Sequence, residues 1–324
     1  MPKVHQQAQS CMELFHKFKE SRVALLGEKL TFSGIGDRDV YNITAPFTDD
    51  GERVIAGRVE SRDTERSEIH FFIRRDGVWV PREGAPRLSL QDPFFTKIKG
   101  ELVLGGVEVF FDPYDSQHIV SWRTLFYRGG RINDLKLFAA GPMNMKDIRL
   151  IELPNGRIGV FTRPFGVAGA TAVIGYTQIQ SLDHLNEEAL LGADLFLDQF
   201  LPSEWGGANE VHLLSNGLVG VLGHIAYYDE QRNRHYHSMT FAYDPYTGIK
   251  TPIKIIATRD LFPEGPSKKN DLADVIFSGG LQRLGDGLAV LYAGVSDAEA
   301  HRIVIPDPFD EYEQHYQAVK DVSA

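Results

Sequence analysis

A two-strand pattern built around an Asn-Gly or Asp-Gly turn recurs along this chain of 324 residues. In each clear copy a polar or basic residue precedes an apolar strand, the turn and a second apolar strand. These copies are residues 148–164, 211–227 and 281–297. Their turn glycines, Gly156, Gly217 and Gly287, lie 61 and 70 residues apart. Such pairs between apolar runs indicate tight β-hairpins.

Two looser copies extend the pattern towards the N-terminus, FFTKIKGELVLGGVEVFF (94–111) and a possible start at DVYNITAPF (39–47). Hairpins recurring at this spacing are typical of a β-propeller, in which each blade has four strands around a central channel. Five copies predict an all-β fold, a five-bladed β-propeller. A long β-sandwich or two stacked barrels is the alternative that the pattern leaves open.

Helical spacing is confined to a few segments. Residues 6–20 and 185–200 show it, and the last stretch, DEYEQHYQAVKDV, is compatible with a surface helix. We therefore expect an N-terminal helical segment (1–26) packed on the propeller, a catalytic propeller domain (27–306) and a short C-terminal helical tail (307–324). The N-terminal segment could instead pack on a partner chain, which leaves an oligomer open.

The charge balance limits the classes of partner. Asp and Glu outnumber Lys and Arg by 44 to 34, a net charge of −10, which argues against a nucleic-acid binder, since such a protein carries a basic surface. No run approaches the roughly 18 apolar residues of a membrane span. The single cysteine, Cys11, excludes an internal disulfide and fits a packed helix position. We expect a cytoplasmic protein that binds neither nucleic acid nor membrane.

Charged residues cluster where the predicted inner strands begin. In a propeller these starts converge on one mouth of the channel, so the residues there would meet. Taken singly, an Asp at such a point is commonly a turn cap and a lone Arg lies on a solvated face. Together, acids and cations suit a sugar substrate with an anionic partner, because carboxylates bind hydroxyls and supply protons while Arg and His bind phosphate.

The segment QDPFF places Asp92 directly before a proline at the start of an apolar strand. Proline lacks a backbone donor and is tolerated at the first position of a strand. We expect Pro93 to keep the chain extended there and so to hold the Asp92 carboxylate at the channel mouth. The alternative is a cap at the strand entry.

The segment QDPFFTKIKGELVL (91–104) resembles the strand that carries the catalytic acid in the mannoside phosphorylases, a five-bladed family. Gln91 and Phe94 depart from it, since that family has an acid and an arginine there. A closer resemblance is to the β-1,2-mannan mannosyltransferase/phosphorylases, long catalogued as a domain of unknown function. It rests on five further segments in the same order: GDRDVYNITAPF, MKDIRLIELPNGRIGVFTRP, EWGGANEVHLLSNGLVGVLGHIA, HSMTFAYDP and FSGGLQRLGDGLAVLYAGVSDAEAH.

This resemblance implies an inverting transfer of mannose between a β-1,2-linked mannoside and phosphate, through mannose 1-phosphate. Asp92 matches the general acid, which in related phosphorylases acts through a sugar hydroxyl. The residues that the resemblance implies for phosphate binding are Arg163, His224, Arg149 and Tyr236. Those for sugar binding are Asp39, Asn42, Asp147, Glu210, His212 and Asp297.

Two other functions remain open on the same fold. One is a furanosidase-like hydrolase with Asp39 as base and Glu210 as acid, since ordinary glycosidases need two carboxyl groups. The other is a sugar-binding propeller without catalysis. We expect no cofactor beyond phosphate as co-substrate, and no metal, because His235 and His237 lack further ligands at suitable spacing. The cluster at 267–270, which contains Lys268 and Lys269, is interpreted as a solvated loop, and the alternative is that it holds a donor phosphate.

Overall fold

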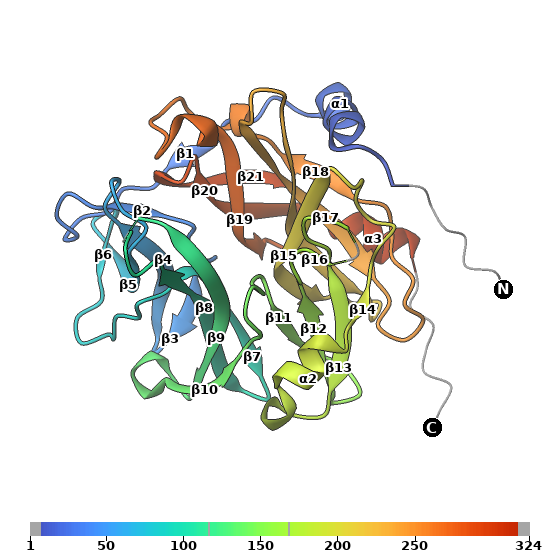
Figure 1. The fold of residues 1–324 in the computed structure, drawn as a ribbon, viewed down its shortest axis with the longest axis horizontal. Helices are drawn as coiled ribbons and strands as arrows, with labels where there is room; N and C mark the ends of the chain where they lie inside the picture. Colours follow the sequence, from blue (N-terminus) through green and yellow to red (C-terminus); the bar gives the residue numbers. More distant parts are fainter. Residues whose placement is uncertain (1–7, 116, 168, 317–324) are drawn as a thin grey trace.

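The computed structural model describes residues 8–115, 117–167 and 169–316. It is mostly β, as predicted, and its sheets follow one another in chain order around the molecule, with the first strand beside the last (Figure 1). The strand order gives four hydrogen-bonded sheets of five, four, four and eight strands. The termini of the described chain therefore lie on the same side of the ring of sheets, and β1 and β21 join its two ends.

The first three sheets are formed by consecutive segments. The first comprises β2 (Asp39–Tyr41), β3 (Phe47–Asp49), β4 (Glu52–Glu60), β5 (Ser67–Arg75) and β6 (Val78–Pro81). The second comprises β7 (Gln91–Ile98), β8 (Glu101–Phe111), β9 (Ile119–Gly129) and β10 (Lys136–Ala140). The third comprises β11 (Arg149–Glu152), β12 (Ile158–Thr162), β13 (Gly175–Ile179) and β14 (Asp194–Leu195).

The eight-stranded sheet has two antiparallel halves. One comprises β15 (Glu204–Leu213), β16 (Val219–Tyr228), β17 (Arg234–Tyr243) and β18 (Lys254–Ala257). The other comprises β19 (Asp274–Arg283), β20 (Leu288–Val295), β21 (Glu299–Pro306) and β1 (Glu28–Lys29). Within the described residues, the strand pairing between the two halves is the parallel pairing of β17 with β19, over His235↔Asp274 and Tyr236↔Val275.

The predicted hairpins are present. The turns of β11–β12, β15–β16 and β19–β20 contain Gly156, Gly217 and Gly287 at φ of 77°, 88° and 80°. Glycine adopts this left-handed conformation without the steric penalty that other residues meet. The looser copies also form hairpins, β7–β8 and β3–β4.

The apolar cores lie between neighbouring groups of strands. One contains Phe94 and Phe126 from the second sheet with Ile148 and Val160 from around the third. Another joins the two halves of the eight-stranded sheet through residues such as Leu222 and Leu291. Each group of strands is thus packed on both faces, which fixes the inner strand ends relative to one another.

Helices are few. They are α1 (Cys11–Ser21), α2 (Glu187–Leu191), α3 (Asp310–His315) and the 3₁₀ turns η1 (Ile132–Asp134), η2 (Leu182–His184), η3 (Arg259–Leu261) and η4 (Asn270–Leu272). No helix of the described residues has the length and apolar character that crossing a membrane requires.

The helix predicted over 185–200 is mostly wrong, since α2 ends at Leu191 with Gly192 as its cap and Leu195 pairs with Gly175 in a strand. The N-terminal helix begins later than its periodicity suggests, because Ser10 and Glu13 form a capping box. The predicted C-terminal helix is observed only as α3; its remainder, 317–324, lies outside the described residues.

Candidate active site

The first strands of three hairpins contain irregular backbone. The register shifts by a β-bulge at Gln91/Phe94, at Ala208/Glu210 and at Ser278/Gly280. Four polar residues of the predicted site have a left-handed backbone, namely Asn42, Asp92, Asp147 and Asp297, with φ of 45°, 49°, 56° and 49°. A bulge redirects a side chain out of the regular alternation. Asp92 lies within one of these bulges; Asn42 donates to it, and the charges of Asp147 and Asp297 interact with it, so the four residues lie close together.

Asp92 is buried within the bulge of β7 and accepts two hydrogen bonds. Its Oδ1 receives Asn42 Nδ2 at 2.7 Å and Arg58 Nη1 at 3.1 Å. The expectation that Pro93 keeps Asp92 extended is wrong, because a φ of 49° is left-handed. The bulge, rather than an extended strand entry, turns the carboxylate towards Arg58.

The charges around Asp92 favour its ionised form. Burial raises the pKa of Asp92, but Arg58, Lys146 and the hydrogen bond from Asn42 together outweigh it and lower the pKa below its usual value. Asp297 shows the opposite balance, because burial and the charge of Asp92 raise its pKa in spite of Arg58. The site therefore holds one carboxylate and one neighbouring carboxyl group that retains its proton more readily.

Arg149 and Arg163 form a buried cationic pair around Asp147. Arg163 donates from Nε to the Gly206 carbonyl at 2.8 Å, and its Nη1 lies 3.1 Å from Asp147 Oδ2. Arg149 donates from Nε to the Asn209 carbonyl and from Nη1 to the Ile148 carbonyl at 3.0 Å. Backbone carbonyls thus orient both guanidinium groups.

The environment of Arg149 explains one departure from the mannoside phosphorylase pattern. Its guanidinium carbon lies 4.1 Å from the centre of the Phe94 ring, where that family has an arginine. Burial lowers the pKa of Arg149 to about 10 in spite of Asp147 and Asp92, so the group stays cationic at neutral pH. The Phe94 ring stabilises the Arg149 cation through a cation–π contact.

His224 is adjacent to the arginines but is not a cation at neutral pH. Burial, then Arg163, lowers its pKa to about 3. Its Nδ1 lies 2.8 Å from Asn209 Oδ1, and its ring stacks on Tyr236 with centroids 5.3 Å apart. The Tyr236 hydroxyl accepts a hydrogen bond from Trp205 at 3.1 Å. The low pKa favours the neutral imidazole form of His224.

Two cations near Asp92 are absent from the predicted set. Arg58 lies inside β4 and is buried; within a strand, nothing in the sequence marks it as a site residue. Lys146 directly precedes Asp147, is half-buried, and lowers the pKa of both Asp92 and Asp147. Its position next to Asp147, a predicted site residue, is the sequence feature that could have identified Lys146.

Three predicted sugar-binding residues have partners of their own. Asp39 forms a two-point ion pair with Arg62, at 2.9 and 2.8 Å. Glu210 bonds to His212 at 2.8 Å and accepts the backbone N–H of Leu281 at 2.6 Å. Among the described residues, no hydrogen bond or ion pair connects Asp39, Glu210 or His212 with Asp92.

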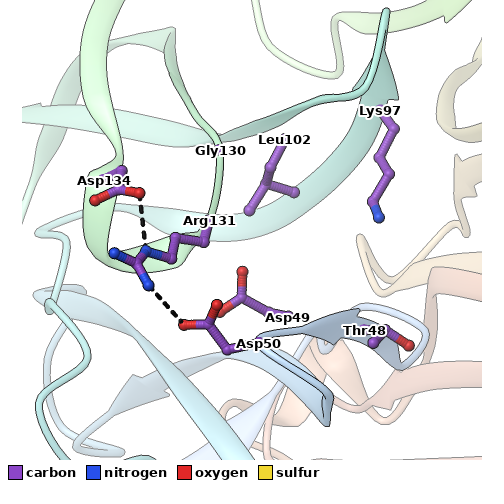
Figure 2. A pocket seen from close by; sticks show the side chains of 8 residues that line it. All are labelled: Thr48, Asp49, Asp50, Lys97, Leu102, Gly130, Arg131 and Asp134. Atoms are coloured by element: carbon purple, nitrogen blue, oxygen red, sulfur yellow. Dashed lines mark hydrogen bonds and ion pairs between the residues drawn. The ribbon is translucent and has the colours of Figure 1, made fainter.

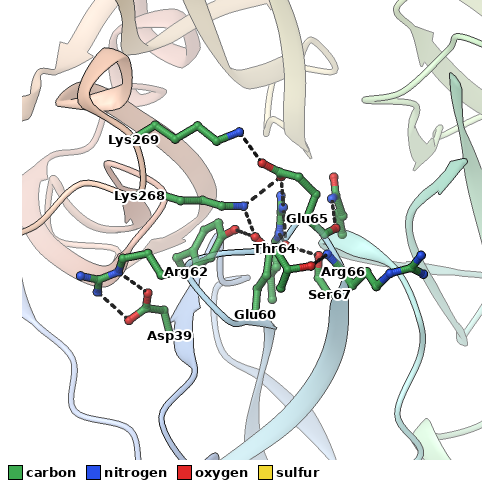
Figure 3. A network of polar contacts seen from close by, with 12 residues as sticks. Asp39, Glu60, Arg62, Thr64, Glu65, Arg66, Ser67, Lys268 and Lys269 are labelled. Carbon is green, nitrogen blue, oxygen red and sulfur yellow. Dashed lines mark hydrogen bonds and ion pairs between the residues drawn. The ribbon is translucent and has the colours of Figure 1, made fainter. Parts of the chain in front are cut away.

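The interpretation of Lys268 as a solvated residue is wrong. Its side chain is 2% exposed and its ammonium pairs with Glu60 and Glu65 (Figure 3). Figure 3 also shows the separate Asp39–Arg62 pair. His235 bonds Asp274 and Asp229, and the described residues contain no cluster of three or more groups suited to a metal ion.

A cavity of about 350 Å³ lies apart from these residues (Figure 2). Its lining consists of Thr48, Asp49, Asp50, Lys97, Leu102, Gly130, Arg131 and Asp134. Arg131 already pairs with Asp134 at 2.9 Å and Asp50 at 3.6 Å. The cavity contains none of the predicted site residues, so the candidate site rests on the polar cluster instead.

The cluster can bind an anion beside a carboxylate. Lys146, Arg149 and Arg163 surround Asp147, three positive charges against one, while Arg58 neutralises Asp92. An oxyanion would meet oriented cations in a poorly solvated setting, where charge-assisted hydrogen bonds are strong.

Comparison with known proteins adds to this geometry. A model of the family described as "Protein of unknown function (DUF1861)" matches residues 16–311. No curated protein matches the sequence significantly.

Similar solved structures include two from Leishmania mexicana. The mannose phosphorylase MPT-4, in complex with a phosphate ion, is 36% identical, with 93% of this chain and 94% of that chain covered and a TM-score of 0.85. The GDP-Man-dependent mannosyltransferase MPT-1 is 35% identical, with 97% and 99% covered and a TM-score of 0.85. A β-1,2-mannobiose phosphorylase from Listeria innocua shares the fold at 14% identity, covering 90% and 94%, with a TM-score of 0.60.

Proposed function

This chain belongs to the DUF1861 family and is a relative of a Leishmania mannose phosphorylase and a mannosyltransferase, and we propose that it is a carbohydrate-active enzyme. It transfers a mannosyl unit between a β-1,2-linked mannoside and phosphate. Its substrates are a mannose-containing oligosaccharide with phosphate, or mannose 1-phosphate with an acceptor. The observation that carries the proposal is the pair of buried, carbonyl-anchored arginines, Arg149 and Arg163, beside Asp147; the charge of Arg149 also interacts with that of Asp92.

In phosphorolysis, phosphate held by Arg149, Arg163 and His224 attacks the anomeric carbon. The new carbon–oxygen bond forms on the face opposite the departing glycosidic oxygen, so the configuration inverts. Asp92 supplies the proton that the departing oxygen takes up and becomes a carboxylate. The products are mannose 1-phosphate and a mannoside one unit shorter. Asp297 and Asn42 are the proposed contacts to the sugar in the reacting position.

The two directions of the reaction begin with different protonation states of Asp92. Synthesis begins with a carboxylate that accepts a proton from the acceptor, and the lowered pKa provides this form. Phosphorolysis begins with the protonated acid. Bound phosphate would offset the positive charges of Lys146, Arg149 and Arg163 and so raise the pKa of Asp92. Protonation of the acid is thereby linked to binding of its co-substrate.

The proposed scaffold is a five-bladed propeller over residues 27–306, with helical segments before and after it. The two halves of the eight-stranded sheet are assigned to separate blades, because their strands pair over only two residue pairs. The hairpins β3–β4, β7–β8, β11–β12, β15–β16 and β19–β20 supply the inner strands of one blade each. A cytoplasmic location is proposed from the single, buried Cys11.

The test is phosphate release from mannose 1-phosphate and mannose, with identification of the disaccharide. Asp92→Asn keeps the size of the side chain but cannot exchange the proton, so turnover should fall by about 10²–10⁴-fold. Asp183→Asn is the matched control, because the Asp183 side chain is 73% exposed and forms a surface ion pair with Arg128. GDP-mannose serves as the second donor.

An Asp92→Asn enzyme with normal turnover would contradict the role of Asp92 as acid. Absence of mannosyl transfer from both donors in the unmodified protein would contradict the proposed function. Hydrolysis that does not depend on phosphate would instead favour the hydrolase.

A further inference from the structure

The loop from β18 to β19 spans the junction between the last strands and the first sheet. Hydrogen bonds within the loop, and one to Ser296 after β20, hold its conformation. Arg259 donates to the carbonyls of Phe262 and Pro263 at 3.1 and 3.0 Å, and the Lys268 N–H donates to the Ser296 carbonyl at 3.0 Å. Ser296 directly precedes Asp297, so this loop is held beside the candidate site.

Two adjacent lysines of this loop differ in their surroundings (Figure 3). The Lys268 side chain is 2% exposed and pairs with Glu60 and with Glu65, the latter at 2.9 Å. The Lys269 side chain is 53% exposed and pairs with Glu65 alone, at 2.7 Å. Both carboxylates belong to the first sheet and the turn after β4. Only Lys268 reaches the buried carboxylate, Glu60.

Glu60 connects this lysine to the candidate site. It accepts Arg58 Nη2 at 2.6 Å and Nε at 3.1 Å, the Tyr41 hydroxyl at 2.8 Å and the Ser67 hydroxyl at 2.5 Å. Arg58 in turn binds Asp92 through Nη1 at 3.1 Å. The side chains of Lys268, Glu60, Arg58 and Asp92 thus form a continuous series of alternating charge, each at most 7% exposed.

Removal of Lys268 would change the ion pairs among the remaining residues of the series. If Lys268 is removed, Arg58 becomes the counter-charge for both Glu60 and Glu65, since Arg58 Nη2 also lies 3.6 Å from Glu65. A buried carboxylate without a full counter-charge is strongly unfavourable. The Arg58 guanidinium would move towards these carboxylates and release Asp92.

We propose that Lys268 is a positioning residue for the catalytic centre, which neutralises Glu60 so that Arg58 remains bound to Asp92. The inference rests on the proposed function for the role of Asp92. The loop between β18 and β19 would thus influence Asp92 indirectly, through the series of charged side chains that begins at Lys268.

The test compares Lys268→Met with Lys269→Met, a neighbouring control that removes the same charge from an exposed position. Lys268→Met should lower turnover of mannose 1-phosphate with mannose by about tenfold to a hundredfold, because small displacements of catalytic groups have effects of that size. Lys269→Met should match the unmodified enzyme. Lys268→Arg should restore most of the activity. Thermal unfolding of each variant verifies folding.

A double variant separates positioning from simple loop anchoring. Glu60→Gln in the Lys268→Met background removes the carboxylate that competes for Arg58. The turnover of the double variant should therefore be about tenfold higher than that of Lys268→Met. If Lys268 only anchors the loop, the double variant would be no better than Lys268→Met. That result, or equal turnover of Lys268→Met and Lys269→Met, would overturn the inference.

A second readout is independent of turnover. The ¹³C resonance of the Asp92 carboxyl, assigned with Asp92→Asn, gives its pKa directly. The groups around this carboxyl are Asn42, Arg58, Lys146, Asp147, Arg149 and Asp297. Lys268→Met should raise the pKa of Asp92 and Lys269→Met should not. This shift in an enzyme inactive on both donors would support the inference while the proposed function fails. An unchanged pKa would overturn the inference even in an active enzyme.

Discussion

At the scale of single residues, the candidate site depends on backbone conformations that most side chains avoid. Asn42, Asp92, Asp147 and Asp297 all have positive φ. Asn and Asp tolerate this region better than other non-glycine residues, yet each such residue stores about 1–3 kcal/mol of strain. Four such residues at converging positions point to a requirement for side-chain direction rather than for folding alone.

Gly207 lies where the arginine, the acid and the histidine converge. A Cβ atom there would be 2.7 Å from Arg163 Cδ, 2.9 Å from Asp147 Oδ2 and 2.9 Å from His224 Cε1. We predict that Gly207→Ala lowers turnover and phosphate affinity by about a hundredfold, because it displaces these groups together. Kinetics with varied mannose 1-phosphate and calorimetric titration of phosphate measure the two effects.

Gly156→Ala is a useful comparison for Gly207→Ala. Gly156 is in a hairpin turn with open space around it, but has a φ of 77°. Its substitution should lower stability through backbone strain and leave turnover per folded molecule intact. Equal losses of phosphate affinity in the two variants would contradict the steric explanation.

The sequence predicted the site residues that follow a recognisable pattern. Asp92, Arg149 and Arg163 lie at or next to the ends of hairpin strands, His224 lies within one, and all four belong to one charged region. Arg58 and Lys268 follow no such pattern: one lies within a strand and the other in a loop. Their burial comes from contacts between the first sheet and the β18–β19 loop, more than 200 residues apart in sequence, which periodicity does not encode.

At the scale of elements, hairpin turns were predictable and helix limits were less so. The turn glycines determine backbone conformation locally, whereas residues 185–200 read as a helix until Gly192 and the pairing of β14 with β13 end it. The helix α1 is an element of another kind, since it lies outside the sheets and contacts β16 and β18. Its Lys19 and Arg22 pair with Asp260.

Cys11 provides a direct test of α1 packing, because it is the single cysteine and is fully buried. Burial, with Glu204 and Asp274, raises the pKa of its thiol, and the thiolate is the reactive form. Native protein should therefore resist modification by Ellman's reagent. Leu14→Ala, which removes a buried contact worth about 2–5 kcal/mol, should accelerate the reaction by local release of α1.

Lys17→Ala serves as the control for this measurement, because Lys17 is exposed on the same helix. Its modification rate should equal that of the unmodified protein. Rapid reaction of the native thiol, or equal rates for Leu14→Ala and Lys17→Ala, would show that α1 does not protect Cys11.

At the scale of the whole molecule, ion pairs join the two ends of the ring of sheets. The pairing of β1 with β21 comprises only Glu28↔Arg302 and Lys29↔His301. Salt bridges from Glu28 to Arg302, from Lys29 to Glu299 and from Lys268 to Glu60 reinforce it. Carboxylates thus contribute both to this closure and to the candidate site, so their protonation should affect the stability of the entire fold.

Acid should destabilise the protein, and the protonation of Asp147 should contribute to this loss of stability. Arg163, Lys146, His224 and Arg149 outweigh burial and lower the pKa of Asp147. A carboxyl with a lower pKa in the folded than in the unfolded chain stabilises the fold above its unfolded pKa, about 3.9 for Asp. That contribution is lost as the pH falls through the folded value. Asp297 and Glu204, whose pKa is raised, change stability in the opposite sense.

We predict that the melting temperature falls below about pH 4 and that Asp147→Asn makes this decline shallower, because one fewer proton is taken up on unfolding. The variant should be less stable at pH 7, where Arg149 and Arg163 lose their counter-charge, and should approach the unmodified protein at pH 2–3. Asp183→Asn, at an exposed position, should follow the unmodified curve throughout. Parallel curves for Asp147→Asn and the unmodified protein would mean that Asp147 titrates alike in both states, and the cationic cluster would then not hold it ionised.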